Sequence, residues 1–272
     1  MKYNFFWLFI FLPSFVFSQG FFDPIPAKTL DTVKLTVTYS FLFTPDSLNP
    51  EYKNEVDVVL FIGSSISLYQ CLNSFIGTKL LAGSRNMDEL RQRARKAPTS
   101  TFSTKIFKNY PPGMITTTDR IMPDNFIFRE DLNQFKWKIS SQTTKIANYT
   151  AQKATVEFGG RSWVAWFTTE IPISDGPHKF NGLPGLILRL YDTRNHFVFD
   201  IVSIKEPEEP QLIELQNLRY IETTKANFRR AREAFRQSVI SETFELITDP
   251  DARRLAAQNM SRRNNPMELR LD

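Results

Sequence analysis

The sequence is poor in the residues that build disulfide frameworks and metal sites. Its 272 residues include one cysteine, Cys71, so no disulfide can form within the chain. We expect Cys71 to be a small buried apolar side chain, and its pairing with another chain is left open. The two histidines, His178 and His196, each lack a second histidine at the spacing of a zinc site. No metal site and no cofactor are therefore predicted.

Strongly one-sided charge is also missing, and long apolar runs are missing beyond the N-terminus. The chain has 34 Lys and Arg against 29 Asp and Glu, a net charge of +5. Nucleic-acid-binding proteins usually concentrate basic residues on one face beside stacking aromatics, so no nucleic-acid partner is expected. The longest later apolar segments, Val58–Ile62 and Leu186–Leu188, have the length of strands. We expect no transmembrane segment in the mature chain.

The N-terminus has the pattern of a secretory signal peptide. Lys2 precedes an apolar run over residues 5–17, which ends next to a small residue. A membrane-spanning helix needs about 20 apolar residues, and this run is shorter and contains Pro13. We expect residues 1–18 to be cleaved and residues 19–272 to form a single exported domain, because no linker divides them.

Most of the mature chain has the pattern of short strands. Apolar and polar residues alternate over 34–43, which predicts a strand with one buried face. The 25 Phe and 8 Tyr also suit a half-buried sheet surface. Further strands are predicted at 56–62, 66–69, 102–107, 114–118, 126–128 and 135–139. These patterns favour a mainly β fold, an antiparallel curved sheet or partly closed barrel.

Helices are expected at two places. One short helix, over 87–97, interrupts the strands, with Asn86 as its cap. The C-terminal segment from about Thr224 is helical, with Phe228 beginning an apolar stripe that packs on the sheet. A second C-terminal helix is expected to begin at Pro250.

Glycines and tryptophans punctuate the segment from 158 to 188. Gly159 and Gly160 join two strand-like runs and predict a tight two-residue hairpin. Alternation along the second run places Trp163 and Trp166 on opposite faces. Farther on, proline followed by glycine predicts a type II turn over 183–186.

That turn lies within a six-residue motif that spells GLPGLI, and the chain resembles the GLPGLI family of exported bacterial proteins. The motif consists of Gly182, Leu183, Pro184, Gly185, Leu186 and Ile187. Its surroundings are also similar to the family core, at 137–139, Ala154, 160–161, 165–167, 170–173, 176–177 and 265–269. Ala151 departs from the family pattern, in which a cysteine is common at this place. The resemblance implies a Gram-negative envelope protein, often associated with outer-membrane transport, without an established activity.

Because the motif has no ionisable group, its expected role is geometric rather than chemical. We expect a binding surface at the loop 174–181 and at an exposed aromatic edge near Trp163. Its candidate binding residues are Asp175, His178, Lys179, Trp163, Trp166 and Arg161. The leading function is a non-enzymatic binding or accessory role, with an outer-membrane transporter or another envelope protein as partner, in the periplasm or at the cell surface.

Two alternatives stay open. Glu170, Asp175 or His178 could act as acid or base in a periplasmic hydrolase of peptides or glycans. The aromatic residues could instead line the cavity of a carrier for lipids or other apolar ligands. A deep cleft that gathers the three ionisable groups would favour the enzyme, and a continuous apolar cavity would favour the carrier.

Overall fold

The computed structural model describes residues 26–100, 102–246, 249–251, 254 and 264–270, with the backbone alone described over 239–246. The expected signal peptide lies outside these residues, and so does most of the helix expected from Pro250. No helix within the described ranges is long and apolar enough to cross a membrane.

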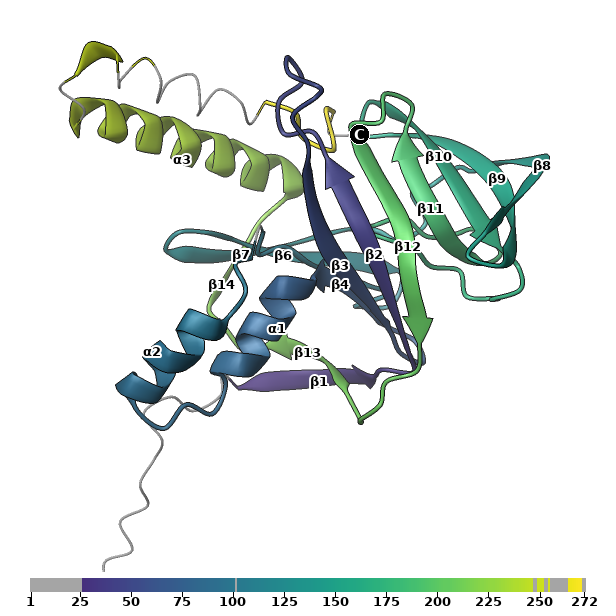
Figure 1. Cartoon of the computed structure of the whole chain (residues 1–272), viewed down its shortest axis with the longest axis horizontal. Helices are drawn as coiled ribbons and strands as arrows, with labels where there is room; N and C mark the ends of the chain where they lie inside the picture. Colours follow the sequence, from purple (N-terminus) through teal and green to yellow (C-terminus); the bar gives the residue numbers. More distant parts are fainter. Residues whose placement is uncertain (1–25, 101, 247–248, 252–253, 255–263, 271–272) are drawn as a thin grey trace, which may run out of the picture.

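A large curved sheet dominates the structure (Figure 1). Its strands are β2 (Leu35–Phe43), β3 (Asn54–Ile62), β4 (Ser67–Cys71), β5 (Lys105–Lys108), β6 (Met114–Ile121), β7 (Asp124–Asp131), β8 (Lys138–Ile146), β9 (Tyr149–Phe158), β10 (Arg161–Thr168), β11 (Leu186–Asp192), β12 (Phe197–Lys205) and β14 (Tyr220–Glu222). Their order across the described sheet is β14-β7-β6-β5-β4-β3-β2-β12-β11-β10-β9-β8. All neighbours are antiparallel except β14 and β7. Two further strands, β1 (Ala27–Thr32) and β13 (Leu212–Gln216), form a separate antiparallel ribbon.

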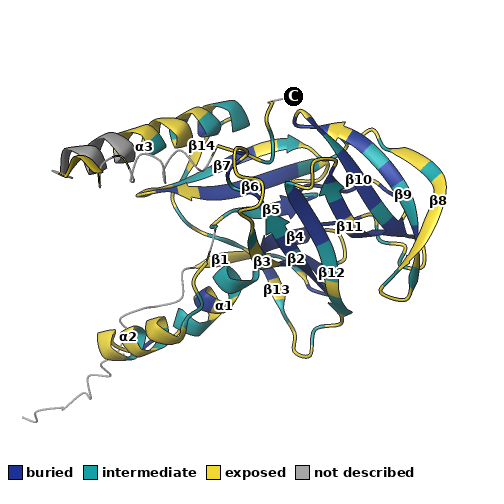
Figure 2. Cartoon of the chain, turned by 45° about the horizontal axis from the view of Figure 1, so that its top comes forward, coloured by how far each residue is buried: buried dark blue, intermediate teal, exposed yellow. Residues whose placement is uncertain are grey.

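The sheet curves around one main hydrophobic core. Buried side chains from β2–β6 and from β9–β12 belong to a single cluster, although these strands lie on different parts of the sheet. Figure 2 shows that the buried stretches belong mainly to the central strands of the sheet. The end strands β8 and β14 are not paired with each other. The expected mainly β, antiparallel curved sheet is therefore confirmed, and the described sheet is not closed into a barrel.

Side-chain alternation accounts for the central strands. Val37, Tyr39 and Phe41 on β2 face the core and are 0%, 0% and 5% exposed, as the period of two requires. The strand expected over 135–139 overlaps β8 only at its last two residues, because β8 begins at Lys138. The aromatic residues just before it belong to the core packing, where hydrophobic burial decides their conformation.

Two helices, rather than the single expected one, interrupt the strands. The expected helix is α2 (Met87–Lys96), and the Asn86 side chain accepts a hydrogen bond from the Glu89 N–H at 2.8 Å. The other is α1 (Leu72–Leu81), which follows β4 directly and has no side-chain cap. The start signals that identify helices in a sequence are therefore missing from α1.

The expected C-terminal helix is α3 (Lys225–Leu246), capped by a hydrogen bond from the Asn227 N–H to Thr224 Oγ1 at 3.2 Å. Phe228 packs against Ile121 of β6 and Phe128 of β7. Phe235, two turns later, is 40% exposed. The first turns of α3 therefore cover the sheet, and the helix then runs past its edge (Figure 1).

Candidate functional site

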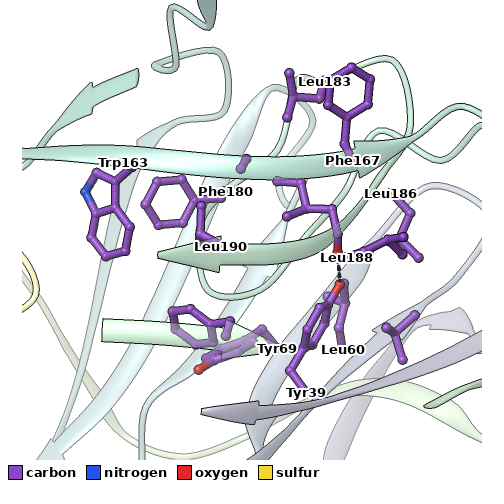
Figure 3. Close-up of a cluster of buried hydrophobic side chains, with 14 of the residues drawn as sticks. Tyr39, Leu60, Tyr69, Trp163, Phe167, Phe180, Leu183, Leu186, Leu188 and Leu190 are labelled. Carbon is purple, nitrogen blue, oxygen red and sulfur yellow. Dashed lines mark hydrogen bonds between the residues drawn. The ribbon is translucent and has the colours of Figure 1, made fainter. Parts of the chain in front are cut away.

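The loop between β10 and β11, residues 169–185, lies inside the curved sheet and is called the interior loop below. Phe180 and Leu183 are 0% and 1% exposed. The Phe180 ring lies 4.8 Å from the Trp163 ring, centroid to centroid. Tyr39 Oη donates a hydrogen bond to the Ile187 carbonyl at 2.8 Å, at the end of the loop (Figure 3). The loop's own side chains thus fill the space in which an apolar carrier would hold its ligand.

Asp175 anchors this loop instead of facing a partner. Its carboxylate forms an ion pair with Lys108 of β5, and the two side chains are 10% and 3% exposed. Lys108 Nζ also donates to the Gly176 carbonyl at 2.5 Å. Burial lowers the pKa of Lys108, and the charge of Asp175 opposes that shift. The expectation that Asp175 belongs to an exposed contact loop is therefore wrong.

Lys179, which is buried, belongs to a set of four charges, the charge square, formed with the partly buried Lys225, Glu130 and Glu268. Lys179 Nζ lies 2.5 Å from Glu130 Oε2 and 2.8 Å from Glu268 Oε1. Lys225 Nζ lies 2.8 Å from Glu130 Oε1 and 2.5 Å from Glu268 Oε2. Burial alone would raise the pKa of Glu268, but the two lysines outweigh it and lower that pKa to about 2. The square joins β7, the interior loop, α3 and the C-terminal segment, so Lys179 is not an exposed binding group.

His178 has an unusual backbone and a buried imidazole nitrogen. Its φ is 55°, in the left-handed region. Its Nδ1 is buried and has no hydrogen-bond partner among the described residues. The ring lies edge-on to Tyr69, with centroids 5.7 Å apart. Burial, followed by the charge of Lys179, lowers the pKa of His178 to about 3, so the imidazole is neutral at physiological pH.

The three acid–base candidates of a hydrolase occupy different environments. Glu170 is exposed and accepts a hydrogen bond from the Thr150 N–H at 2.7 Å. Asp175 is held in its buried ion pair, and the Nδ1 of His178 is enclosed. A catalytic site requires such groups to converge on one accessible position. Within the described ranges, no three His, Cys, Asp or Glu side chains come together as a possible metal site.

The GLPGLI motif closes the interior loop through close backbone packing. A Cβ on Gly185 would lie 2.0 Å from the Thr168 carbonyl oxygen, so only glycine fits there. Gly185 lacks the positive φ of a type II turn, and that expectation is wrong. Gly182 has the positive φ instead, at 91°. Leu183, Leu186 and Ile187 are buried, whereas Pro184 is exposed.

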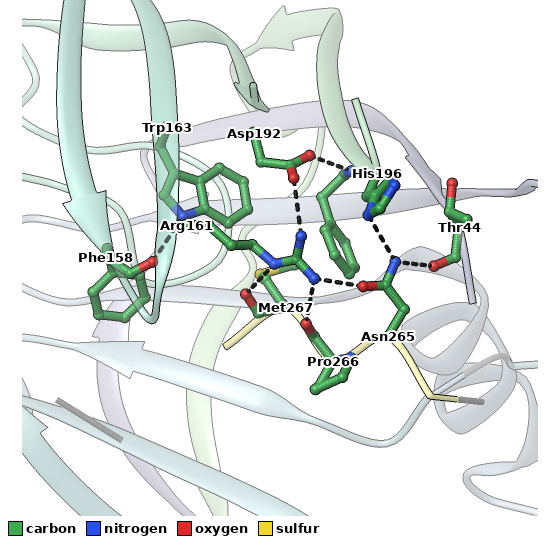
Figure 4. Close-up of polar contacts among 10 residues, drawn as sticks. Thr44, Phe158, Arg161, Trp163, Asp192, His196, Asn265, Pro266 and Met267 are labelled. Atoms are coloured by element: carbon green, nitrogen blue, oxygen red, sulfur yellow. Dashed lines mark hydrogen bonds and ion pairs between the residues drawn. The ribbon is translucent and has the colours of Figure 1, made fainter. Parts of the chain in front are cut away.

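Arg161 binds the C-terminal segment rather than an external partner (Figure 4). Its Nη1 lies 3.0 Å from Asp192 Oδ2, and both side chains are almost fully buried. Its other nitrogens donate to Asn265 Oδ1 at 2.5 Å, the Pro266 carbonyl at 2.9 Å and the Met267 carbonyl at 3.0 Å. We call this arrangement the arginine latch. Arg161 directly follows Gly159 and Gly160, which connect β9 to β10 with φ of 60° and 75°. The expected tight hairpin is therefore confirmed.

The two tryptophans of β10 have different surroundings. Trp163 is 0% exposed and its Nε1 donates to the Phe158 carbonyl at 3.1 Å, so the expected exposed edge near Trp163 is wrong. Trp166 is half-buried and lines an open hollow of about 480 Å³ on the outside of the sheet. This open hollow is the candidate functional site. Its lining residues are Thr144, Lys145, Ile146, Trp166, Arg189, Tyr191 and Asn195.

The hollow combines aromatic faces with positive charge. Lys145 and Arg189 belong to its lining, which contains no carboxylate. The Arg189 guanidinium lies 5.4 Å from the centroid of the Tyr191 ring and 3.0 Å from the nearer oxygen of Asp200, outside the lining. Trp166 and Arg189 are paired across β10 and β11. Such a surface can stack against an apolar or planar group and attract an anionic one.

Only Trp166 of the hollow was found from the sequence. The other lining residues come from β8, from β11 and from the turn after β11, which become neighbours through the sheet order. Register between separate strands is set by tertiary packing and cannot be obtained from the alternation within one strand. Alternation along β11 could, however, have placed Arg189 and Tyr191 on a common face.

A comparison with protein families identifies a match to a family of unknown function. A family model described as "Protein of unknown function (Porph_ging)" matches residues 159–189. The match covers the Gly–Gly hairpin, β10, the interior loop and the beginning of β11. No curated protein matches the sequence. The resemblance to the GLPGLI family by that name stays an expectation from the motif.

Solved structures show a related fold. The chain is similar to PNGF-II in two crystal forms, C2 and P21, each with a TM-score of 0.51, 14% identity and 76% of this chain covered. The match covers 34% of PNGF-II, so this chain corresponds to about a third of that protein. An uncharacterized conserved protein from Thermus thermophilus matches with a TM-score of 0.35, 9% identity, and 71% and 92% of the two chains covered. At such identities the PNGF-II likeness concerns the fold alone.

Proposed function

We propose that this protein is an exported, non-catalytic binding protein of the cell envelope, and that the hollow around Trp166 is its contact site. One observation carries the proposal. Two half-buried aromatic residues, Trp166 and Tyr191, and two exposed cations, Arg189 and Lys145, line one open hollow. Aromatic residues and arginine are the side chains that most often anchor protein interfaces.

The buried charges support a binding role rather than acid–base chemistry. Asp175 and Lys179, the ionisable groups nearest to His178 in the interior loop, are held in ion pairs with fixed partners. Their geometry stabilises the loop, and a reacting group would have to displace that loop to approach them. The groups of the hollow, by contrast, are accessible without any change in the fold.

Export and a transport-related partner form the remaining part of the proposal. The N-terminal pattern of residues 1–18 supports secretion, and the GLPGLI resemblance supports a role beside an outer-membrane transporter. Fractionation of native cells and N-terminal sequencing of the mature protein test the export. A cytoplasmic protein that retains its first 18 residues would contradict it.

Site-specific photocrosslinking in intact native cells tests the contact site. A benzophenone amino acid at Tyr191 should crosslink to an envelope partner. The same amino acid at Tyr52, which is 51% exposed in the loop between β2 and β3, serves as the matched control. We expect Trp166→Ala to reduce capture from Tyr191 by about tenfold or more, the loss typical of an interface anchor. Equal capture from both positions, or none from Tyr191, would contradict the assignment.

A further inference from the structure

The hollow borders an open strand edge. β8 ends the sheet and, among the described strands, pairs with β9 alone. Seven of its nine side chains are exposed, and Figure 2 shows it as the outer rim of the sheet. Residues Thr144, Lys145 and Ile146, at its C-terminal end, also line the hollow. An edge strand offers unpaired N–H and C=O groups to which another strand can add.

The same region carries an excess of positive charge. Residues 133–156 contain four lysines and neither aspartate nor glutamate. Lys136, Lys138 and Lys145 are exposed. Glu170 already accepts from the Thr150 N–H and Asp200 already pairs with Arg189, whereas Glu157 of β9, just past this segment, is exposed. The edge therefore favours a negatively charged partner over a basic one.

We propose that an extended, acidic peptide segment of a partner protein adds as a strand to the free edge of β8 and places a side chain in the hollow. This inference rests on the function proposed above and specifies its ligand. Strand addition supplies affinity through the backbone, and adjacent pockets supply specificity for alternate side chains. The open edge favours a polypeptide over a saccharide, because it presents N–H and C=O groups at the spacing of a strand.

A second copy of this chain fits the edge poorly. Two β8 strands placed side by side would bring their lysines together, and like charges across a strand pair destabilise it. Lysines on an edge strand also serve to prevent self-association. That protective role accounts for the lysines of β8, but it does not account for the open hollow with Trp166 and Tyr191 beside them.

Hydrogen-bond geometry identifies a residue for the test. Hydrogen-bonded and non-hydrogen-bonded pairs alternate along an antiparallel ladder. The two-residue loop at Ala147 and Asn148 is closed by the pair Ile146 and Tyr149, which exchange hydrogen bonds across the hairpin. Because the two kinds of pair alternate, the N–H of Thr143, three residues before Ile146, points away from β9 to the free edge. Proline is tolerated on an edge strand when the missing N–H faces outward.

Binding to the full-length mature protein tests the proposal. The probe is a fluorescein-labelled peptide of about ten residues, the length of a strand, that alternates glutamate with valine or tyrosine. Its controls are the lysine counterpart and a version with alternate backbone nitrogens methylated. We expect fluorescence anisotropy to show binding of the acidic peptide at least about tenfold tighter than of either control, weakening as salt is raised. Hydrogen exchange of β8 should slow in the complex.

Two protein variants locate the contact. Thr143→Pro should weaken binding of the acidic peptide by about tenfold or more while Thr143→Ala leaves it unchanged, and Lys145→Glu should also weaken it. Circular dichroism at increasing temperature checks that each variant is folded. If Thr143→Pro does not fold, the methylated peptide still tests the hydrogen bonds between the peptide and the β8 backbone. Equal binding of the acidic and basic peptides would overturn the inference.

An acidic glycan is the competing ligand class. If an oligogalacturonate binds the hollow and the peptides do not, the strand-addition proposal is wrong. Crosslinking from Tyr191 would in that case still decide the function proposed above, so the two failures can be told apart.

Discussion

Mild acid should destabilise the protein through His178. Its pKa is about 3 in the folded chain and 6.5 in a model peptide. The unfolded chain therefore binds more protons at every pH between these values. The neutral imidazole makes its full contribution to the free energy of unfolding above about pH 6.5, and this contribution is lost as pH falls toward 3.

The size of the effect follows from the two pKa values. Each pH unit below 6.5 removes about 1.4 kcal/mol, so acidification from about pH 7 to about pH 5 removes at most about 2 kcal/mol. The charged groups that face the ring are Lys179, Lys108, Lys225 and Glu268. Glu268 loses its own contribution only as pH falls from the usual glutamate pKa of 4.5 toward its lowered pKa of about 2, below this window.

Urea denaturation followed by tryptophan fluorescence at the two pH values measures this loss. His178→Asn is the informative variant, because asparagine tolerates the positive φ of 55° and does not titrate. We expect the variant to lose most of the dependence on pH that the wild-type protein shows. Equal stability of the wild-type protein at both pH values, or an unchanged slope in His178→Asn, would refute the assignment of a buried neutral histidine.

Three further predictions concern a close backbone contact, with one control substitution, a buried ion pair and a helix cap. Gly185→Ala places a methyl group against the Thr168 carbonyl and should lower the free energy of unfolding in denaturant by at least about 3 kcal/mol. Gly77→Ala in α1 is the control, because its methyl group has room, and it should be neutral or stabilising. Similar values for both variants would contradict the close approach at Gly185. Arg161→Met leaves a buried carboxylate unpaired and should cost about 3–5 kcal/mol, with faster proteolysis of the C-terminal segment. Asn86→Ala removes the cap of α2 and should cost about 1 kcal/mol, measured by the same unfolding assay.

Elements with strong local signals were predictable from the sequence. The alternation over 34–43 gives β2, the glycine pair gives the hairpin of β9 and β10, and Asn86 gives the start of α2. Each of these depends on interactions within a few residues of the chain. α1 was missed because it begins without a cap, and Phe135 was assigned to a strand because burial in an aromatic cluster and burial in a sheet leave the same apolar pattern.

The candidate site was less predictable, for a physical reason. Asp175, His178 and Lys179 are polar residues in a loop without regular structure, which usually indicates exposure. Here each meets groups from distant strands that neutralise or enclose it, such as Lys108 and Glu130. A sequence contains the charges of such pairs but not the topology that brings them together.

Several residues in the segments that carry the family resemblance serve one structural task. Gly185 allows the interior loop to pass against β10, and Arg161 binds the segment that contains Pro266 and Met267. Glu268, in the same segment, completes the charge square with Lys179. These contacts hold the interior loop inside the curved sheet, so in this chain the motif serves to close the core. Ligand choice is then free to vary on the outer face, at the hollow and the edge of β8, where side chains can change without disturbing that core.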